Sequence, residues 1–219
     1  MFRSKTQNLI FPQAEHSRLA GAIANLWGND DFDRPNFNFK SFVTGVTLHD
    51  VGYGYFDSHG IGEMNSAARL AVTRQLVESR LDDAIAQTVM HFHVLRLLGN
   101  DVTGQPLRVA CEQKIELGIS KTGISRRDYL WADRITNLCD KISFEFCFDK
   151  PSQGSIAVYP KQESRDAVTV NFEIRAQGEI KVSPWPFGVY SYEGFTLAYE
   201  ADGYPESLTP TLIGYRLSE

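Results

Sequence analysis

The spacing of apolar residues changes at about residue 149, and this change constrains the fold more than any other feature of the chain. Before it, apolar residues recur at intervals of three and four, which is typical of amphipathic helices. After it, apolar and polar residues alternate, most clearly over residues 168–174, as in a strand with one buried face. We therefore predict a mainly α fold, with a helical body over residues 1–148 and a β-rich C-terminal extension over residues 149–219 packed on it.

The same pattern predicts the individual elements. The helices are expected at residues 12–27, 39–50, 65–80, 81–99, 105–117 and 125–147. The strands are expected at residues 156–159, 168–174, 179–182, 195–199 and 212–216, with a turn at 176–178. Trp185 and Phe187 lie in a Pro-Trp-Pro-Phe run, and we expect these aromatic rings to pack the extension onto the body.

Composition excludes several classes of protein. The net charge is −5, and the longest basic run is Arg126-Arg127, which argues against a nucleic-acid-binding face. The N-terminus lacks the apolar block of a secretory signal, and no apolar segment approaches the roughly 20 residues that span a bilayer. The three cysteines show no CxxC spacing, so neither a disulfide framework nor a thiolate zinc site is indicated. We expect a cytoplasmic protein.

The dipeptide His49-Asp50 stands at the end of the second predicted helix. Adjacent helical residues diverge by about 100°, so both side chains face the interior only if a polar partner lies there. A divalent metal accepts an imidazole nitrogen and a carboxylate oxygen at once. Two more residues on predicted helices can complete such a site: His16, 33 residues before His49, and Asp140, 90 residues after Asp50. We therefore predict a divalent metal cofactor. Mn, Fe, Ni, Zn and Mg all remain candidates for its identity.

The order His…His-Asp…Asp resembles the metal signature of the HD-domain superfamily, which are helical metal-dependent phosphohydrolases. Over most of its length the chain also resembles a bacterial family of unknown function within that fold. That resemblance rests on residues 13–20 (QAEHSRLA), residues 49–53 (HDVGY) with Asp57, residues 139–147 (CDKISFEFC) and residues 184–187 (PWPF). It implies that four residues hold the metal: His16, His49, Asp50 and Asp140. Relatives often carry tryptophan at the position of Tyr53, so this chain keeps an aromatic ring and adds a hydroxyl.

Three further residues are predicted to act in catalysis: Asp57, His91 and His93. Superfamily members with two metals use extra histidines between the His-Asp pair and the last aspartate. His91 and His93 are about 200° apart on a helix, so both cannot face one metal, and the family's spacing favours His93. Asp57 and His59 lie in a glycine-rich loop, where ionisable residues often form the rim of a site. Either one can instead be an ordinary loop residue.

Structural alternatives exist for several of these residues. Asp140 has Lys141 beside it and Arg134 nearby, so a structural ion pair competes with metal binding. Taken alone, His16 is an ordinary histidine on an amphipathic face. Glu15 can orient a substrate or water, but it is more often a solvated helix residue.

We predict a phosphohydrolase that acts on a small phosphate ester or nucleotide through a metal-activated water. Asp57 or one of the two histidines would be the general base, and Arg18 or Arg96 would bind phosphate. The alternatives are a non-catalytic sensor domain that binds a metal or metabolite, and an HD-type di-iron oxygenase. The expected partner is a phosphorylated small molecule, with a homodimer as an option and neither nucleic acid nor membrane as a partner.

Overall fold

A computed structural model describes residues 2–4, 7–51, 57, 66–99, 104–147 and 152–219. Tyr53 and His59 lie outside these residues. Within the described ranges the chain forms six helices: α1 (Gln13–Leu26), α2 (Phe39–Thr47), α3 (Ser66–Glu78), α4 (Ala84–Leu98), α5 (Gln105–Thr122) and α6 (Arg126–Cys147). They correspond to the six predicted helices. None of the described helices is long and apolar enough to cross a bilayer.

Three helix bounds differ from the prediction by three residues or more. The fourth helix begins at Ala84 rather than residue 81. The fifth helix continues to Thr122 rather than residue 117. The second helix ends at Thr47, three residues early, because the backbone tightens there: His49 N–H donates to Val46 O at 3.3 Å. Val51 N–H donates in the same way to Leu48 O. The His49-Asp50 pair therefore lies in a turn rather than on a helix.

Among the described residues, seven strands form one mixed sheet in the order β1-β2-β6-β7-β5-β4-β3. Their bounds are β1 (Phe2–Arg3), β2 (Leu9–Phe11), β3 (Ser152–Val158), β4 (Val168–Ile174), β5 (Glu179–Ser183), β6 (Ser191–Glu200) and β7 (Pro210–Ser218). The five C-terminal strands were predicted, as was the turn between β4 and β5. The first two strands were not predicted, because every residue of β2 is buried and no alternation marks it.

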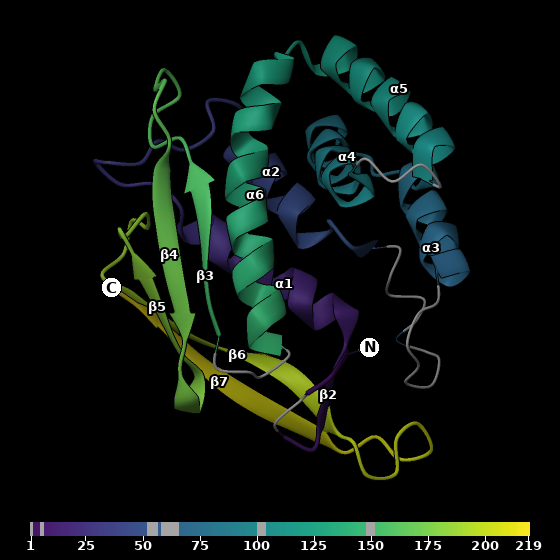
Figure 1. Ribbon diagram of the computed structural model, residues 1–219, viewed down its shortest axis with the longest axis vertical. Helices are drawn as coiled ribbons and strands as arrows, with labels where there is room; N and C mark the ends of the chain where they lie inside the picture. The colour runs from purple at the N-terminus through teal and green to yellow at the C-terminus, as the bar shows by residue number, and fades with distance from the viewer. Residues whose placement is uncertain (1, 5–6, 52–56, 58–65, 100–103, 148–151) are drawn as a thin grey trace.

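The sheet curves along one side of the helices, with α6 and α1 lying against it (Figure 1). Burial alternates along β4, where Val170, Phe172 and Ile174 face the helices and are buried. Apolar side chains of the helices and of the sheet form one continuous core. Pairing of β2 with β6 also brings the N-terminal segment into the sheet. The chain is thus a mixed α/β structure, consistent with a helical body and a β-rich extension.

Two glycines allow helix α2 to approach its neighbours closely. A Cβ atom at Gly21 of α1 would lie 2.0 Å from Thr47 Oγ1 of α2, and one at Gly45 would lie 2.7 Å from Ala86 O of α4. Both distances are far below van der Waals contact, so only glycine fits at these crossings. As a result, the C-terminal end of α2 is held close to both α1 and α4.

The Pro-Trp-Pro-Phe run packs the extension onto the body, as predicted. Phe187 is buried and lies edge-to-face on Trp27, with ring centroids 6.1 Å apart. The backbones join as well, since Gly28 N–H donates to Pro186 O and Gly188 N–H donates to Leu26 O, both at 2.9 Å. This contact fixes the C-terminal end of α1 to the sheet.

Candidate metal centre

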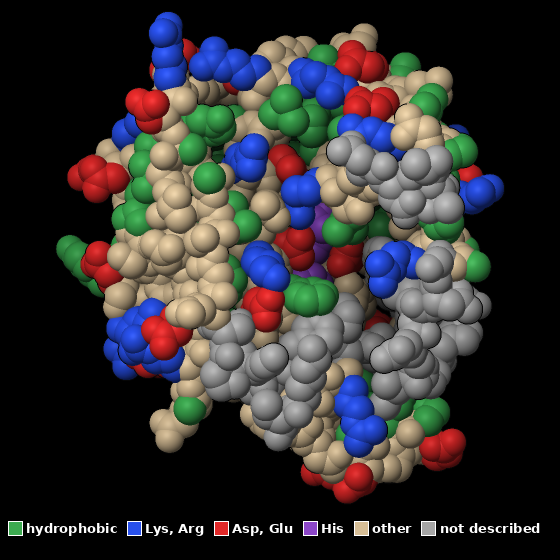
Figure 2. Space-filling model, in the orientation of Figure 1, with side chains coloured by type: hydrophobic (Ala, Val, Ile, Leu, Met, Phe, Trp, Pro, Cys, Tyr) green, Lys and Arg blue, Asp and Glu red, His purple; other side chains and the backbone are tan. Residues whose placement is uncertain are grey.

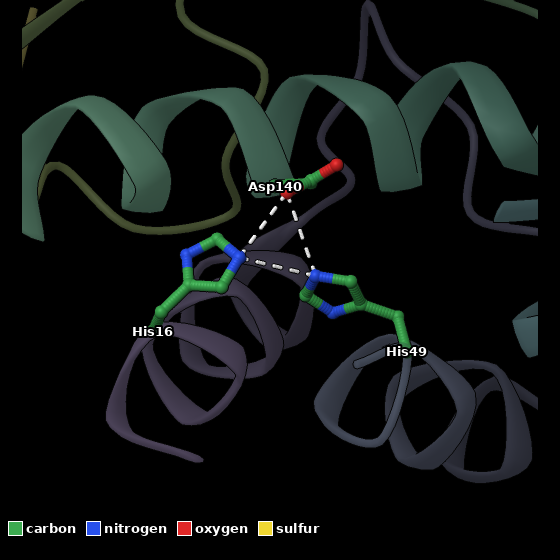
Figure 3. A group of neighbouring side chains, drawn as sticks. All are labelled: His16, His49 and Asp140. Atoms are coloured by element: carbon green, nitrogen blue, oxygen red, sulfur yellow. Dashed lines mark hydrogen bonds and ion pairs between the residues drawn. The ribbon is translucent and has the colours of Figure 1, made fainter. Parts of the chain in front are cut away.

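Four side chains from three segments converge in the interior between α1, α2 and α6. His16 comes from the first turns of α1, His49 and Asp50 from the turn after α2, and Asp140 from the middle of α6. Figure 3 shows the two imidazoles and the Asp140 carboxylate pointing toward one another. Asp140 Oδ1 lies 3.3 Å from His16 Nε2 and 3.4 Å from His49 Nε2. Asp50 Oδ2 lies 3.6 Å and 3.7 Å from the same two nitrogens.

Hydrogen bonds on the far side of each imidazole set its tautomer. His49 Nδ1 lies 2.6 Å from Val46 O, and a carbonyl can only accept, so Nδ1 carries a hydrogen. Ser143 Oγ donates to Asp140 O at 2.9 Å and therefore accepts from His16 Nδ1, also at 2.9 Å. When these rings are neutral, the Nε2 lone pair faces the other donors. This is the tautomer that metal-binding histidines adopt.

The spacing of these donor atoms fits a metal ion. The two Nε2 atoms lie 3.3 Å apart, so the five measured separations range from 3.3 to 3.7 Å. Separations of 3.3–3.7 Å are those of neighbouring ligand atoms that each lie roughly 2.0–2.3 Å from one ion, which matches metal–nitrogen and metal–oxygen bonds. The buried histidine and aspartate groups in the described residues could therefore hold a metal ion.

The two carboxylates at this centre carry the negative charge that a cation requires. Burial opposes charge on His49, Asp50 and Asp140, but the interactions of these groups with their neighbours outweigh it. The charges of Asp50 and Asp140 overcome the effect of burial on His49 and raise its pKa to about 9. Burial raises the pKa of Asp50, but His49 and His93 lower it by a larger amount, so this pKa lies below its usual range. The pKa of Asp140 is also lowered, by hydrogen bonds from His16 and His49. Both carboxylates are ionised at neutral pH.

A second set of residues holds the two carboxylates in place. His93 Nε2 lies 3.1 Å from Asp50 Oδ1, and Gln13 Nε2 donates to Asp50 Oδ2 at 2.6 Å. Arg96 donates to His93 Nδ1 at 2.9 Å and to Asp140 Oδ2 at 3.3 Å. Burial lowers the pKa of His93, so this imidazole is neutral. Arg96 and His93 therefore connect the outer oxygens of both aspartates.

The predicted catalytic residues have defined positions. His93 lies against Asp50, whereas His91 points elsewhere on α4, with its Nε2 3.5 Å from Gln87 Nε2. Burial lowers the pKa of His91 to about 4. Asp57 accepts hydrogen bonds from the backbone N–H groups of Gln13 and Ala14, at 2.8 and 3.2 Å, and so caps the N-terminus of α1. The catalytic roles of Asp57, His91 and His93 stay predictions.

Other polar candidates have structural partners. Glu15 accepts from Arg18 and from Leu197 N at 2.8 Å, which fastens α1 to β6. Arg18 also donates to Phe195 O at 2.6 Å. Lys141 pairs with Glu145, so the ion-pair partner of Asp140 is Arg96 rather than the cations near it in sequence.

Sequence reasoning missed the supporting roles of Ser143, Gln13 and Arg96. A signal for two of them existed, because residues three apart on a helix are neighbours. Ser143 follows Asp140 by three residues, and Arg96 follows His93 by three. Gln13 gave no such signal, since its partner Asp50 is 37 positions away in sequence.

The centre opens to one face of the molecule. Figure 2 shows histidine atoms at the bottom of a hollow, with acidic side chains beside them and Lys or Arg side chains on its rim. The histidine side chains are at most 1% exposed, whereas those of Asp50 and Asp140 are 9% and 14% exposed. A ligand entering the hollow would therefore reach the carboxylate side first.

Comparisons with known proteins give a family match at the N-terminal end of the chain. A family model described as "Protein of unknown function (DUF3891)" matches residues 1–67. The matched segment contains His16, His49 and Asp50 and ends before Asp140. No curated protein and no solved structure matches the chain. Over residues 1–67 the chain is thus similar to a family whose description names no activity.

Proposed function

We propose that this protein is a metal-dependent phosphohydrolase of the HD-domain type that acts on a small phosphate ester or a nucleotide. The observation that carries the proposal is the convergence of two imidazole Nε2 atoms and two ionised carboxylates, with nitrogen–oxygen separations of 3.3–3.7 Å. The donor order His…His-Asp…Asp adds support. Two nitrogen and two oxygen donors suit Mn, Fe, Ni or Zn better than Mg, which prefers oxygen ligands.

His16, His49, Asp50 and Asp140 would hold the ion. A divalent ion bound there lowers the pKa of a bound water and neutralises charge that develops on a phosphoryl oxygen. The chain itself supplies orientation. Ser143 and the Val46 carbonyl accept the Nδ1 hydrogens and direct both Nε2 atoms inward, so the rings are oriented before the ion arrives. His49 must still release its Nε2 proton, because its pKa is about 9.

One ion agrees with the geometry better than the two of a di-iron oxygenase. A second ion would need the group His49, Asp50 and His93, whose donor atoms lie within 4.8 Å of one another. A guanidinium only donates hydrogen bonds, so His93 Nδ1 must accept from Arg96 and Nε2 carries the hydrogen. That hydrogen points at Asp50 Oδ1, 3.1 Å away. His93 is thereby a positioning residue for Asp50 rather than a metal ligand.

The proposal is tested by metal analysis combined with an activity screen. Protein loaded with Mn²⁺, Fe²⁺, Ni²⁺ or Zn²⁺ is assayed on phosphoesters and nucleotides, alongside Asp140→Asn and the exposed control Asp202→Asn. We expect about one ion per chain and turnover in the wild type and in the control, and loss of both in Asp140→Asn. Turnover that survives in Asp140→Asn would contradict the metal mechanism. A fully loaded wild-type site without turnover on any substrate would favour the sensor alternative.

A further inference from the structure

A pocket of 860 Å³ lies across the N-terminal half of α6. Its lining comes from α6, from Arg96 of α4 and from the β3–β4 connection over residues 159–165. Its size falls in the range of small-molecule sites. It contains none of the four donor residues of the metal centre, so it is a separate feature of the surface.

The pocket is positively charged in an acidic protein. Five arginines and two aspartates line it, whereas the chain as a whole carries a net charge of −5. The five arginines are Arg96, Arg126, Arg127, Arg134 and Arg165. The second and third of these occupy the first turn of α6, where the helix dipole disfavours a cation. Helix stability therefore does not account for this concentration of positive charge.

Two of the arginines have no acidic partner among the residues that the structure describes. Arg126 pairs with Glu112 and Glu116, and Arg127 lies 3.7 Å from Glu163. Arg96 is held by the metal-centre network and by Asp133. For the exposed side chains of Arg134 and Arg165, the described part of the chain provides neither an ion pair nor a hydrogen bond. An anionic ligand in the pocket would therefore meet two free guanidinium groups.

The pocket also adjoins the metal centre. Arg96 lines it and at the same time donates to Asp140 Oδ2 at 3.3 Å. Arg134 precedes Asp140 by six residues on α6, which is roughly 9 Å along the axis at 1.5 Å per residue. Figure 2 shows Lys and Arg side chains beside the hollow that contains the histidines.

We infer that this pocket is a second anion site that binds a phosphate chain through Arg134 and Arg165. The inference rests on the proposed function in one respect: it makes the bound chain the non-reacting part of the substrate of the metal centre. Such a substrate carries a second anionic group roughly 9 Å or more from the reacting phosphoryl group. A simple phosphomonoester is too short to meet both sites.

Binding of inorganic triphosphate to the metal-free full-length protein in EDTA tests the pocket apart from the metal. The variant Arg134→Gln/Arg165→Gln is compared with Arg175→Gln/Arg216→Gln, which removes the same charge from exposed positions just after β4 and in β7. By calorimetry we expect wild type and control to bind equally, the pocket variant at least tenfold more weakly, and a matching loss for ATP. Equal loss in both double variants would show only a general charge effect and overturn the inference, as would undetectable binding to wild type.

The two proposals fail differently. If Asp140→Asn abolishes turnover while the pocket variant binds triphosphate normally, the metal mechanism stands and the anion site is wrong. If the pocket variant loses triphosphate binding while Asp140→Asn remains active, the anion site stands and the metal mechanism is wrong. Because both pocket arginines are exposed, the variant is expected to fold, and thermal unfolding checks this.

Discussion

The hydroxyl of Ser143 gives the sharpest test of the metal centre. This side chain is fully buried, accepts the Nδ1 hydrogen of His16 at 2.9 Å and donates to Asp140 O at 2.9 Å. In Ser143→Ala the Asp140 carbonyl still lies within helix α6, but the buried Nδ1–H group of His16 loses its acceptor. An unsatisfied buried donor costs about 1–3 kcal/mol, and the gain in helix propensity from serine to alanine offsets about 0.5 kcal/mol of this.

Most of that cost falls on the metal-bound state. Metal binding at His16 Nε2 requires the hydrogen on Nδ1, where the variant offers no acceptor. The metal-free protein avoids the cost of an unsatisfied N–H group, because His16 can carry its hydrogen on Nε2 instead and donate it to Asp140 Oδ1, 3.3 Å away. We therefore expect metal affinity to fall about 10-fold, at the lower end of the range for such supporting residues. The free energy of unfolding of the metal-free protein should change by less than about 1 kcal/mol.

Ser17 supplies a matched control. It is also buried, follows His16 directly, and its Oγ has no hydrogen-bond partner among the described residues. Chelator competition gives the affinity for Mn²⁺, and urea unfolding in EDTA gives the stability of the metal-free protein. Ser17→Ala should bind metal as the wild type does. If Ser143→Ala also binds normally, or if both variants weaken equally, the tautomer argument is refuted.

Two further predictions concern protonation and helix capping. The pKa of His49 is about 9 in the metal-free protein, so metal binding at neutral pH must release its proton. Metal affinity should therefore rise about tenfold per pH unit from pH 7 to 9. Calorimetry in buffers of different ionisation enthalpy counts the released proton, and a metal affinity that does not change with pH would contradict the prediction. Asp57→Ala removes the acceptor for Gln13 N and Ala14 N and should lower the free energy of unfolding by about 1 kcal/mol, as for other lost N-caps. Thermal unfolding measures this change, and Asp202→Ala is expected to melt as the wild type does.

Local periodicity predicted most of the fold. Helices such as α1 and α6 carry long apolar stripes. The alternation of apolar and polar residues in β4 corresponds to its buried and exposed faces. It failed where burial is complete over a short span, as in β2, and where a helix end depends on backbone turns, as at Thr47. The sheet order, with its parallel β5–β7 pair, depends on contacts that no local pattern encodes.

The convergence of the four predicted donor residues was expected for a different reason, and their role as metal ligands stays a prediction. Buried histidines and aspartates on apolar helix faces are costly without a partner, so their positions stand out in sequence. The argument that His49 and Asp50 diverge on a helix was wrong in its premise, because both lie in a turn. Distances between segments 33 and 90 residues apart, and the participation of Gln13, required the structure.

The separation of the donors along the chain gives a bound ion a second role. His16, the His49-Asp50 pair and Asp140 stand far apart in sequence, and the three cysteines are free thiols. An ion bound to all four would act as a cross-link that closes two long loops, which follow one another along the chain. Such closures restrict the unfolded chain in the way disulfides do, with a stabilisation that grows slowly with loop length. A chain whose three cysteines are free thiols would then gain from a bound ion the kind of topological constraint that disulfide bonds provide.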